Sequence, residues 1–204
     1  MIIINGKGGV GKDTLCDFAA KHYPVRNVSS ITPIKEIAAA NGWQGEKTPK
    51  ARKFLADLKE LFTQYNDLPT RYLLEQYQEF LAGEERIMFA HIREGGEIDK
   101  LKKQVPGDCI TLLVKRTGDG PESWGNASDD DVENYHYDYQ YDNSRPLDEA
   151  EEDFVKFLEE ILEERQRMQP ERPETNREIN RKTNQETNRE MNLESGKQGS
   201  RHGL

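Results

Sequence analysis

The 204-residue sequence predicts an α/β protein built on a doubly wound parallel sheet of about five strands. Short strand-like apolar runs alternate along the chain with segments whose apolar residues recur at helical spacing. Two of these runs, residues 86–92 and 109–114, are of strand length and mostly apolar, as strands covered on both faces are. The apolar run at the start of the chain, residues 1–5, is followed by a glycine-rich loop, and a helical segment follows that loop directly.

Residues 1–5 are β-branched and apolar up to a glycine, which indicates the first strand. Leu15, Phe18 and Ala19 follow at helical spacing and indicate a helix over 13–22. A second strand is predicted at 27–31. Thr32 as N-cap and Pro33 in the first turn then predict a helix to residue 40. Two further helices are predicted from amphipathic segments at residues 51–65 and 71–82.

The second half of the folded part continues the alternation of strands and helices. The runs at 86–92 and 109–114 are the third and fourth strands, and a charged helical stretch at 97–103 separates them. Residues 118–131 are rich in Gly, Asp, Ser and Pro and predict a loop. A last strand at 135–141 precedes a helix at 148–168 that carries apolar residues on one face.

Composition divides the chain into two parts. Residues 166–204 hold 8 basic and 6 acidic residues, only 5 apolar ones and an asparagine every fourth position from Asn176 to Asn192. With no apolar face to bury, they are predicted to be a disordered low-complexity tail. Residues 1–165 carry 21 basic and 32 acidic side chains and nearly all the apolar residues, so they are predicted to form one domain.

Several functional classes are excluded by composition. No apolar run approaches the roughly 18 residues of a membrane span, so we expect a cytoplasmic protein that does not bind membranes. Cys16 and Cys109 form neither a metal-ligand pair nor a disulfide framework, and both are predicted to be buried thiols. The acidic domain argues against binding to duplex nucleic acid. Small phosphorylated ligands remain compatible with it.

The most specific signal is the loop between the first strand and the first helix. It reads Gly6-Lys7-Gly8-Gly9-Val10-Gly11-Lys12-Asp13-Thr14. Glycines let the backbone curl so that successive N–H groups point at a phosphate, and the helix N-terminus adds partial positive charge. ATP phosphates are therefore predicted to contact Gly6, Gly8, Gly9, Val10, Gly11, Lys12, Asp13 and Thr14.

The residues after Lys12 depart from the usual phosphate-binding loop, in which Ser or Thr follows the lysine directly and ligates Mg²⁺. Here Asp13 intervenes and Thr14 follows. Thr14 is our prediction for the phosphate and Mg²⁺ shell. Two interpretations of Asp13 stay open: it holds a metal-bound water, or it is a carboxylate favoured in the first turn of a helix.

With its Gly-Lys-Asp-Thr ending, the chain resembles the phage and bacterial deoxynucleoside monophosphate kinases, within the P-loop nucleoside monophosphate kinases. The resemblance covers residues 1–165. Its further matching segments are Pro33 to Ala38, Gly42-Trp43 with Lys47, Arg52 to Lys59, His91 to Glu94 with Glu97-Ile98, Val114 to Arg116, Tyr137-Asp138 and Asp142-Asn143. Where many members carry Asp-x-Arg on the third strand, this chain has His91-Ile92-Arg93.

The resemblance implies transfer of a phosphoryl group from ATP, with Mg²⁺, to a (deoxy)nucleoside monophosphate. Lys12, with Arg93 and Arg116 at the ends of the third and fourth strands, would be the catalytic cations. A helical insertion would hold the acceptor's phosphate through Lys35, Arg52 and Lys59, and residues 118–131 would form a lid.

Other interpretations remain open at this stage. The acceptor is alternatively another small metabolite, for which Asp13 would be the nearest base if the acceptor were an alcohol. A third hypothesis is a non-catalytic nucleotide-binding module. His91 is interpreted as a structural residue rather than a base, and Asp138, Asp142 and Asn143 either contact the donor base or cap the last helix. The sequence does not predict base preference, sugar preference or oligomeric state.

Overall fold

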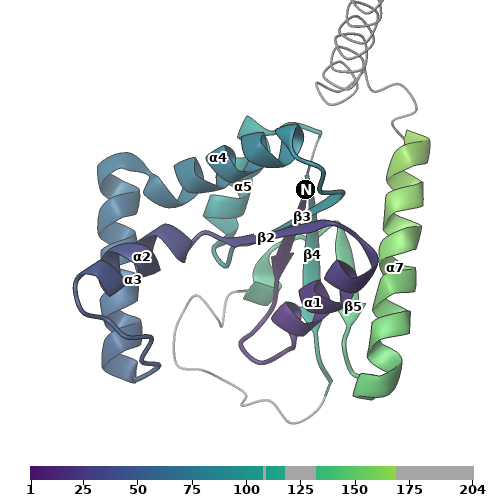
Figure 1. Cartoon of the computed structure of the whole chain (residues 1–204), viewed down its shortest axis with the longest axis horizontal. Coiled ribbons are helices and arrows are strands. Elements are labelled where there is room, and N and C mark those ends of the chain that lie inside the picture. The colour runs from purple at the N-terminus through teal and green to yellow at the C-terminus, as the bar shows by residue number, and fades with distance from the viewer. Residues whose placement is uncertain (108, 118–131, 169–204) are drawn as a thin grey trace, which may run out of the picture.

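A computed structural model describes residues 1–107, 109–117 and 132–168, and a five-stranded parallel sheet forms its centre (Figure 1). The strand order is β2-β3-β1-β4-β5, and every neighbouring pair is parallel. The strands are β1 (Ile2–Asn5), β2 (Val25–Ser29), β3 (Ile87–His91), β4 (Ile110–Lys115) and β5 (Tyr139–Asp142). The predicted α/β class and doubly wound parallel sheet are confirmed.

Helices cover both faces of this sheet. On one face, α1 (Lys12–His22) and α7 (Leu147–Met168) pack with Ile2 and Ile4 in one apolar cluster. On the other face, α4 (Leu68–Ala82) and α5 (Gly95–Gln104) pack with Ile3 in a second cluster. Successive strand residues point to opposite faces, so Ile2, Ile3 and Ile4 must all be apolar for β1 to serve both clusters. The predicted buried state of both cysteines is confirmed as well.

Two helices form an arm beside the sheet. Figure 1 shows α2 (Thr32–Ala40) and α3 (Pro49–Asn66) standing away from the strands, with α4 leading back to them. No residue of α3 is buried, and Phe54, Leu61 and Tyr65 are exposed. The helix is present as predicted, but these three residues of its apolar stripe face solvent.

Three predicted boundaries are corrected by tertiary contacts. The second strand begins at Val25, because it pairs with β3 from Ile87 onward. The fifth begins only at Tyr139, since the backbone and side chain of Thr111 both bond to Asp138, directly before that strand. Thr32 is the first residue of α2 rather than its cap, and Ile31 occupies the cap position.

The order of the strands creates a switch point at β1. Both β3 and β4 lie beside β1, so the segments that follow these two strands flank the loop that follows β1. Ligands of open α/β sheets bind at such a point, at the carboxyl ends of the strands. The 3₁₀ helix η1 (Val132–Asn134) lies between β4 and β5 in sequence.

Two predicted segments, the lid and the tail, lie wholly or partly outside the residues that the structure describes. The predicted lid, residues 118–131, lies outside the described residues, as does the tail from residue 169 onward. The predicted domain boundary at residue 165 falls within α7, which ends at Met168. None of the helices in the described ranges has both the length and the apolar character needed to cross a membrane.

Candidate phosphate-binding site

The glycine-rich loop runs from the end of β1 to Gly11, the N-cap of α1. Its backbone adopts positive φ at Gly6, Gly9 and Gly11, with values of 147°, 84° and 90°. Other residues pay a steric penalty in this region, so these positions favour glycine. At Gly6 the requirement is stricter, because a Cβ would collide with the backbone carbonyl of Val114 on β4.

The two lysines of the loop have different partners. Lys12 Nζ donates to the carbonyl oxygens of Gly6 at 2.5 Å and Lys7 at 2.9 Å. Lys7 Nζ lies 3.3 Å from the Glu133 carboxylate of η1. The ammonium group of Lys12 is therefore held against the loop itself, whereas that of Lys7 is directed to a neighbouring element.

Asn5 anchors the start of the loop, and sequence reasoning missed it. Its side chain is buried at 1% exposure. Oδ1 accepts a hydrogen bond from the Gly6 N–H at 2.8 Å, while Nδ2 contacts the Arg93 carbonyl at 2.9 Å and the Tyr137 hydroxyl at 2.8 Å. One amide thus joins the loop to the segment after β3. The available signal was a polar residue ending an apolar strand.

Arg93 and Arg116 flank the loop on opposite sides. Arg93 follows β3 and Arg116 follows β4, and both side chains are exposed. Strands lie about 4.8 Å apart, so the two backbone segments come to about 10 Å from each other across β1. This spacing places the backbone of one arginine on each side of β1. Their catalytic role stays a prediction.

His91, at the end of β3, is partly buried beside the first turn of α1, and 15% of its side chain is exposed. Its Nε2 lies 2.8 Å from Asn27 Oδ1 and 3.7 Å from Cys16 Sγ, and its Nδ1 lies 3.9 Å from Asp13 Oδ1. Burial lowers the pKa of His91 to about 4, and the positive charges of Lys12 and Lys35 act in the same direction. The imidazole is therefore neutral near pH 7. Burial also raises the pKa of the Cys16 thiol, which keeps it protonated.

The lowered pKa of His91 predicts acid destabilisation. The unfolded chain binds a proton on this imidazole below about pH 6.5, whereas the folded chain resists it down to about pH 4. Stability that is present above pH 6.5 is therefore lost as the pH falls through this window, by up to about 3 kcal/mol.

Urea unfolding at pH 7 and pH 4.5 measures this effect. The free energy of unfolding should fall less between these two pH values in a His91→Gln variant than in the wild type. The same loss in both proteins would contradict the assignment.

Lys59 of α3 binds two carboxylates at the start of α5, those of Glu94 and Glu97. Its Nζ lies 2.6 Å from Glu94 Oε2 and 2.8 Å from Glu97 Oε2, and only 12% of its side chain is exposed. Despite burial, the Lys59 charge holds the pKa of Glu94 below its usual value. Burial, together with the neighbouring charge of Glu94, raises the pKa of Glu97. Lys59 thus joins the arm to the first turn of α5, directly after Arg93.

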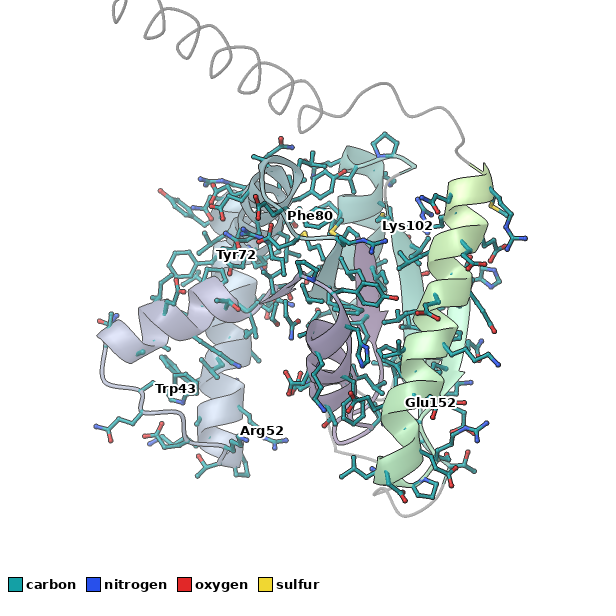
Figure 2. The ribbon with its side chains drawn as sticks, turned by 45° about the vertical axis from the view of Figure 1, so that its right-hand side comes forward. Trp43, Arg52, Tyr72, Phe80, Lys102 and Glu152 are labelled. Carbon is teal, nitrogen blue, oxygen red and sulfur yellow. The ribbon has the colours of Figure 1, made fainter. Side chains whose placement is uncertain are left out.

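The contact of Lys59 also orients the rest of α3. Arg52 precedes Lys59 by seven residues, about two helical turns or 10 Å, so both leave the helix on the same side. Figure 2 shows Arg52 near the start of α3 and Trp43 on the connection that precedes this helix. Arg52 and Lys35 are both exposed, and Lys35 is close enough to His91 to affect its pKa. The substrate-binding roles of Lys35, Arg52 and Lys59 stay predictions.

The structure distinguishes three residues whose roles were left open. Asp138 accepts hydrogen bonds from the Thr111 N–H at 2.8 Å and hydroxyl at 2.9 Å, on β4. Asp142 accepts one from the Thr117 hydroxyl at 3.1 Å. Asn143 donates to the carbonyl oxygen of Val10 at 2.8 Å, within the loop.

Asp13 and Thr14 occupy the first turn of α1, and both side chains are exposed. Carboxylate and hydroxyl oxygens suit Mg²⁺, which takes few protein ligands and completes its shell with phosphates and waters. Within the described ranges, no cluster of three or more His, Cys, Asp or Glu side chains forms a metal cage. The donor set therefore fits a Mg²⁺ ion that is carried by a nucleotide.

Comparisons with known proteins give distant structural neighbours only. No protein-family model matches the sequence, and no curated protein does. A shikimate kinase from Aquifex aeolicus is 11% identical, with a TM-score of 0.44 over 79% of this chain and 98% of that one. A gluconokinase from Sinorhizobium meliloti is 18% identical, with a TM-score of 0.37 over 80% and 95%. Similarity this low carries no argument about activity or substrate.

Proposed function

We propose that this protein is an ATP-dependent kinase of (deoxy)nucleoside monophosphates. The observation that carries the proposal is the placement of the glycine-rich loop at the switch point of the sheet. Lys12 lies within that loop, and exposed arginines follow both flanking strands. Phosphoryl transfer requires two anionic substrates held in line with positive charge over the moving group. Lys12, Arg93 and Arg116 would supply this positive charge.

On the donor side, the loop N–H groups and the N-terminus of α1 would hold the phosphates of ATP. Lys12 would contact the β- and γ-phosphates, which compete for its ammonium group with the carbonyl oxygens of Gly6 and Lys7. Thr14 and Asp13 would hold Mg²⁺, which when bound adds positive charge across the donor phosphates. Arg93 and Arg116 would stabilise charge on the transferred group from the two sides.

On the acceptor side, the α2–α3 arm supplies the binding groups. The ion pairs of Lys59 with Glu94 and Glu97 turn one face of α3 toward the sheet domain, and Arg52 lies on that face. A guanidinium group matches the geometry of a phosphate dianion. A monophosphate bound by Arg52 would be ionised already and would need no general base.

An acceptor panel tests the proposed reaction. ADP release is measured with saturating Mg-ATP and each of the common ribo- and deoxyribonucleoside monophosphates, and chromatography identifies the diphosphate product. The corresponding nucleosides, which lack the phosphate, are the matched negative controls. We expect at least one monophosphate to support turnover. If none raises ADP release above the rate without acceptor, the kinase proposal fails, and a non-catalytic nucleotide-binding module becomes the better hypothesis.

Arg52→Ala should raise the KM for the monophosphate by about tenfold or more, because a charged hydrogen bond to the acceptor contributes about 1.5–3 kcal/mol. The KM for ATP should stay within about twofold of the wild type, since the donor loop lies on another element.

Lys53→Ala is the control for Arg52→Ala. It removes the same charge from the next position of α3, where Lys53 pairs with the exposed Asp57. Equal effects of the two variants on the KM would show that general charge, and not Arg52, attracts the acceptor.

A second acceptor class is favoured by one observation. The Asp13 side chain is 93% exposed beside Lys12, where a carboxylate base for an alcohol acceptor would be needed. A mild effect of Asp13→Asn on turnover would exclude a base role and support a phosphate acceptor. Turnover that falls by a factor of about 100 or more while the affinity for Mg-ATP is unchanged would support an alcohol acceptor, because loss of a Mg²⁺ ligand would weaken Mg-ATP binding as well.

A further inference from the structure

Residues 142–144, which end β5 and begin the turn to α7, contact both sides of the candidate site. Three consecutive side chains face two different segments. Asn143 contacts the glycine-rich loop, while Asp142 and Ser144 contact Thr117, the residue after Arg116. The turn follows the edge strand of the sheet and lies more than 120 residues from the loop in sequence.

Asn143 is fitted closely to the loop. Its side chain is 8% exposed, and its Nδ2 donates to the Val10 carbonyl at 2.8 Å. The same nitrogen lies 2.5 Å from the position that a Cβ on Gly11 would take. Gly11 therefore needs to be glycine for two reasons, its φ of 90° and the amide of Asn143. The Asn143 backbone N–H is held in turn by the Lys115 carbonyl at 2.8 Å.

The hydrogen bond from Asn143 determines the direction of a loop N–H group. The carbonyl of Val10 and the N–H of Gly11 belong to one planar trans peptide, so they point in opposite directions. Because Asn143 holds the carbonyl, the Gly11 N–H points away from Asn143. Three glycines at positive φ leave the loop backbone few restraints of its own, so this contact limits its freedom.

The neighbours of Asn143 extend the same restraint to the segment after β4. The Thr117 N–H donates to Ser144 Oγ at 2.7 Å, and its hydroxyl donates to Asp142 Oδ2 at 3.1 Å. Asp142 also accepts a hydrogen bond from Ser144. The backbone that carries Arg116 is thus tied to the turn that holds the loop.

From these contacts we infer that Asn143 is a positioning residue, which holds the glycine-rich loop in its phosphate-binding conformation and in register with the Arg116 segment. The inference rests on the proposed function for the reaction that the loop serves. By this inference, Asn143 supports binding of the donor phosphates through its hydrogen bond to Val10, and it does not contact the donor base.

Inorganic triphosphate and Mg-ATP are the two probes that test this assignment, with affinities measured by calorimetry. Asn143→Asp keeps the shape of the side chain but faces the Val10 carbonyl with a second acceptor. We expect it to weaken the binding of both probes by the same factor, about tenfold to a hundredfold. Weaker Mg-ATP binding with unchanged triphosphate binding would overturn the inference, because Asn143 would then serve the base. Unchanged binding of both probes would overturn it as well.

Thr111→Val is the matched control. Thr111 is fully buried on β4, and its hydroxyl bonds to Asp138 next to β5 at 2.9 Å. The substitution removes two part-buried hydrogen bonds from the same strand pair, one donated by the Thr111 hydroxyl to the Asp138 carboxylate and one accepted from the Asp138 N–H. It should lower the melting temperature without changing triphosphate affinity. A loss of affinity as large as that of Asn143→Asp would show that any weakening of this strand pair impairs the loop, and would overturn the inference.

Asn143→Ala keeps the test decisive if Asn143→Asp does not fold. It removes the donor without adding a charge, and it should weaken the binding of both probes by about tenfold. Failure of the inference and failure of the proposed function are distinguishable. An inactive acceptor panel with wild-type triphosphate binding would overturn only the kinase proposal. A wild type that binds no triphosphate would overturn the inference itself.

Discussion

Replacing Lys12 by alanine should lower kcat/KM at least a thousandfold while the protein remains folded. The ammonium group lies against the Gly6 and Lys7 carbonyls in the loop that we assign to the donor phosphates. Its charge would oppose the negative charge of the transferred group where little water screens it, and one such contact is worth roughly a hundredfold to a thousandfold. The variant should also bind ATP more weakly, which lowers kcat/KM further. Steady-state kinetics with the acceptor found in the panel measures it.

Lys7→Ala is the control for Lys12→Ala. Lys7 belongs to the same loop and loses the same charge, but its Nζ pairs with Glu133 on a partly exposed surface. Such pairs contribute about 0–1 kcal/mol, so kcat/KM should fall by less than about fivefold. Unfolding curves of both variants separate loss of function from loss of fold. An inactive Lys7→Ala beside an active Lys12→Ala would contradict our assignment of the loop.

Replacing Lys59 by methionine should lower the free energy of unfolding by about 2–4 kcal/mol. The substitution leaves Glu94 and Glu97 without their common cation, and a buried charge that loses its partner is strongly destabilising. Glu97 is 16% exposed and bears most of this cost, while solvent screens Glu94, which is 37% exposed. Urea unfolding at pH 7 measures the loss.

The pH dependence of that loss identifies its cause. Without Lys59, protonation of Glu94 and Glu97 removes the repulsion, so the deficit relative to the wild type should shrink as the pH falls from 7 to 5. Lys53→Met is the control on the same helix. It breaks an exposed pair with Asp57 and should cost less than about 0.5 kcal/mol. A deficit that is independent of pH would instead indicate lost packing around the aliphatic part of Lys59.

The Lys59→Met result also bears on how acceptor-binding residues are chosen from sequence. Lys35, Arg52 and Lys59 all lie on helices whose polar faces are normally charged, so sequence treats them alike. In the structure they differ, because Lys59 is bound to Glu97 of α5 and to Glu94, the N-cap residue of that helix, whereas Lys35 and Arg52 are exposed. No sequence pattern within α3 indicates this, since Glu94 and Glu97 lie about 35 residues further along the chain.

Patterns within a few residues determined the features that depend on local chemistry. Apolar runs that alternate with helical segments were enough for the parallel α/β class, because a strand covered on both faces is apolar along nearly its whole length. Glycine spacing was enough to locate the loop, because positive φ is a property of single residues. Predictions failed where contacts between distant residues set a boundary. The start of β2 depends on its pairing with β3, and the start of β5 depends on the bonds between Thr111 and Asp138.

Only the tertiary structure decided which side chains hold the loop in place. Asn5 and Asn143 lie 138 positions apart in sequence, yet one bonds to the start of the loop at Gly6 and the other near its end at Val10. Their amides take these roles because the crossovers of the sheet bring the carboxyl ends of β1, β4 and β5 to one edge. Asparagine is common in loops and turns, so its function there depends on the backbone that the completed fold places beside it.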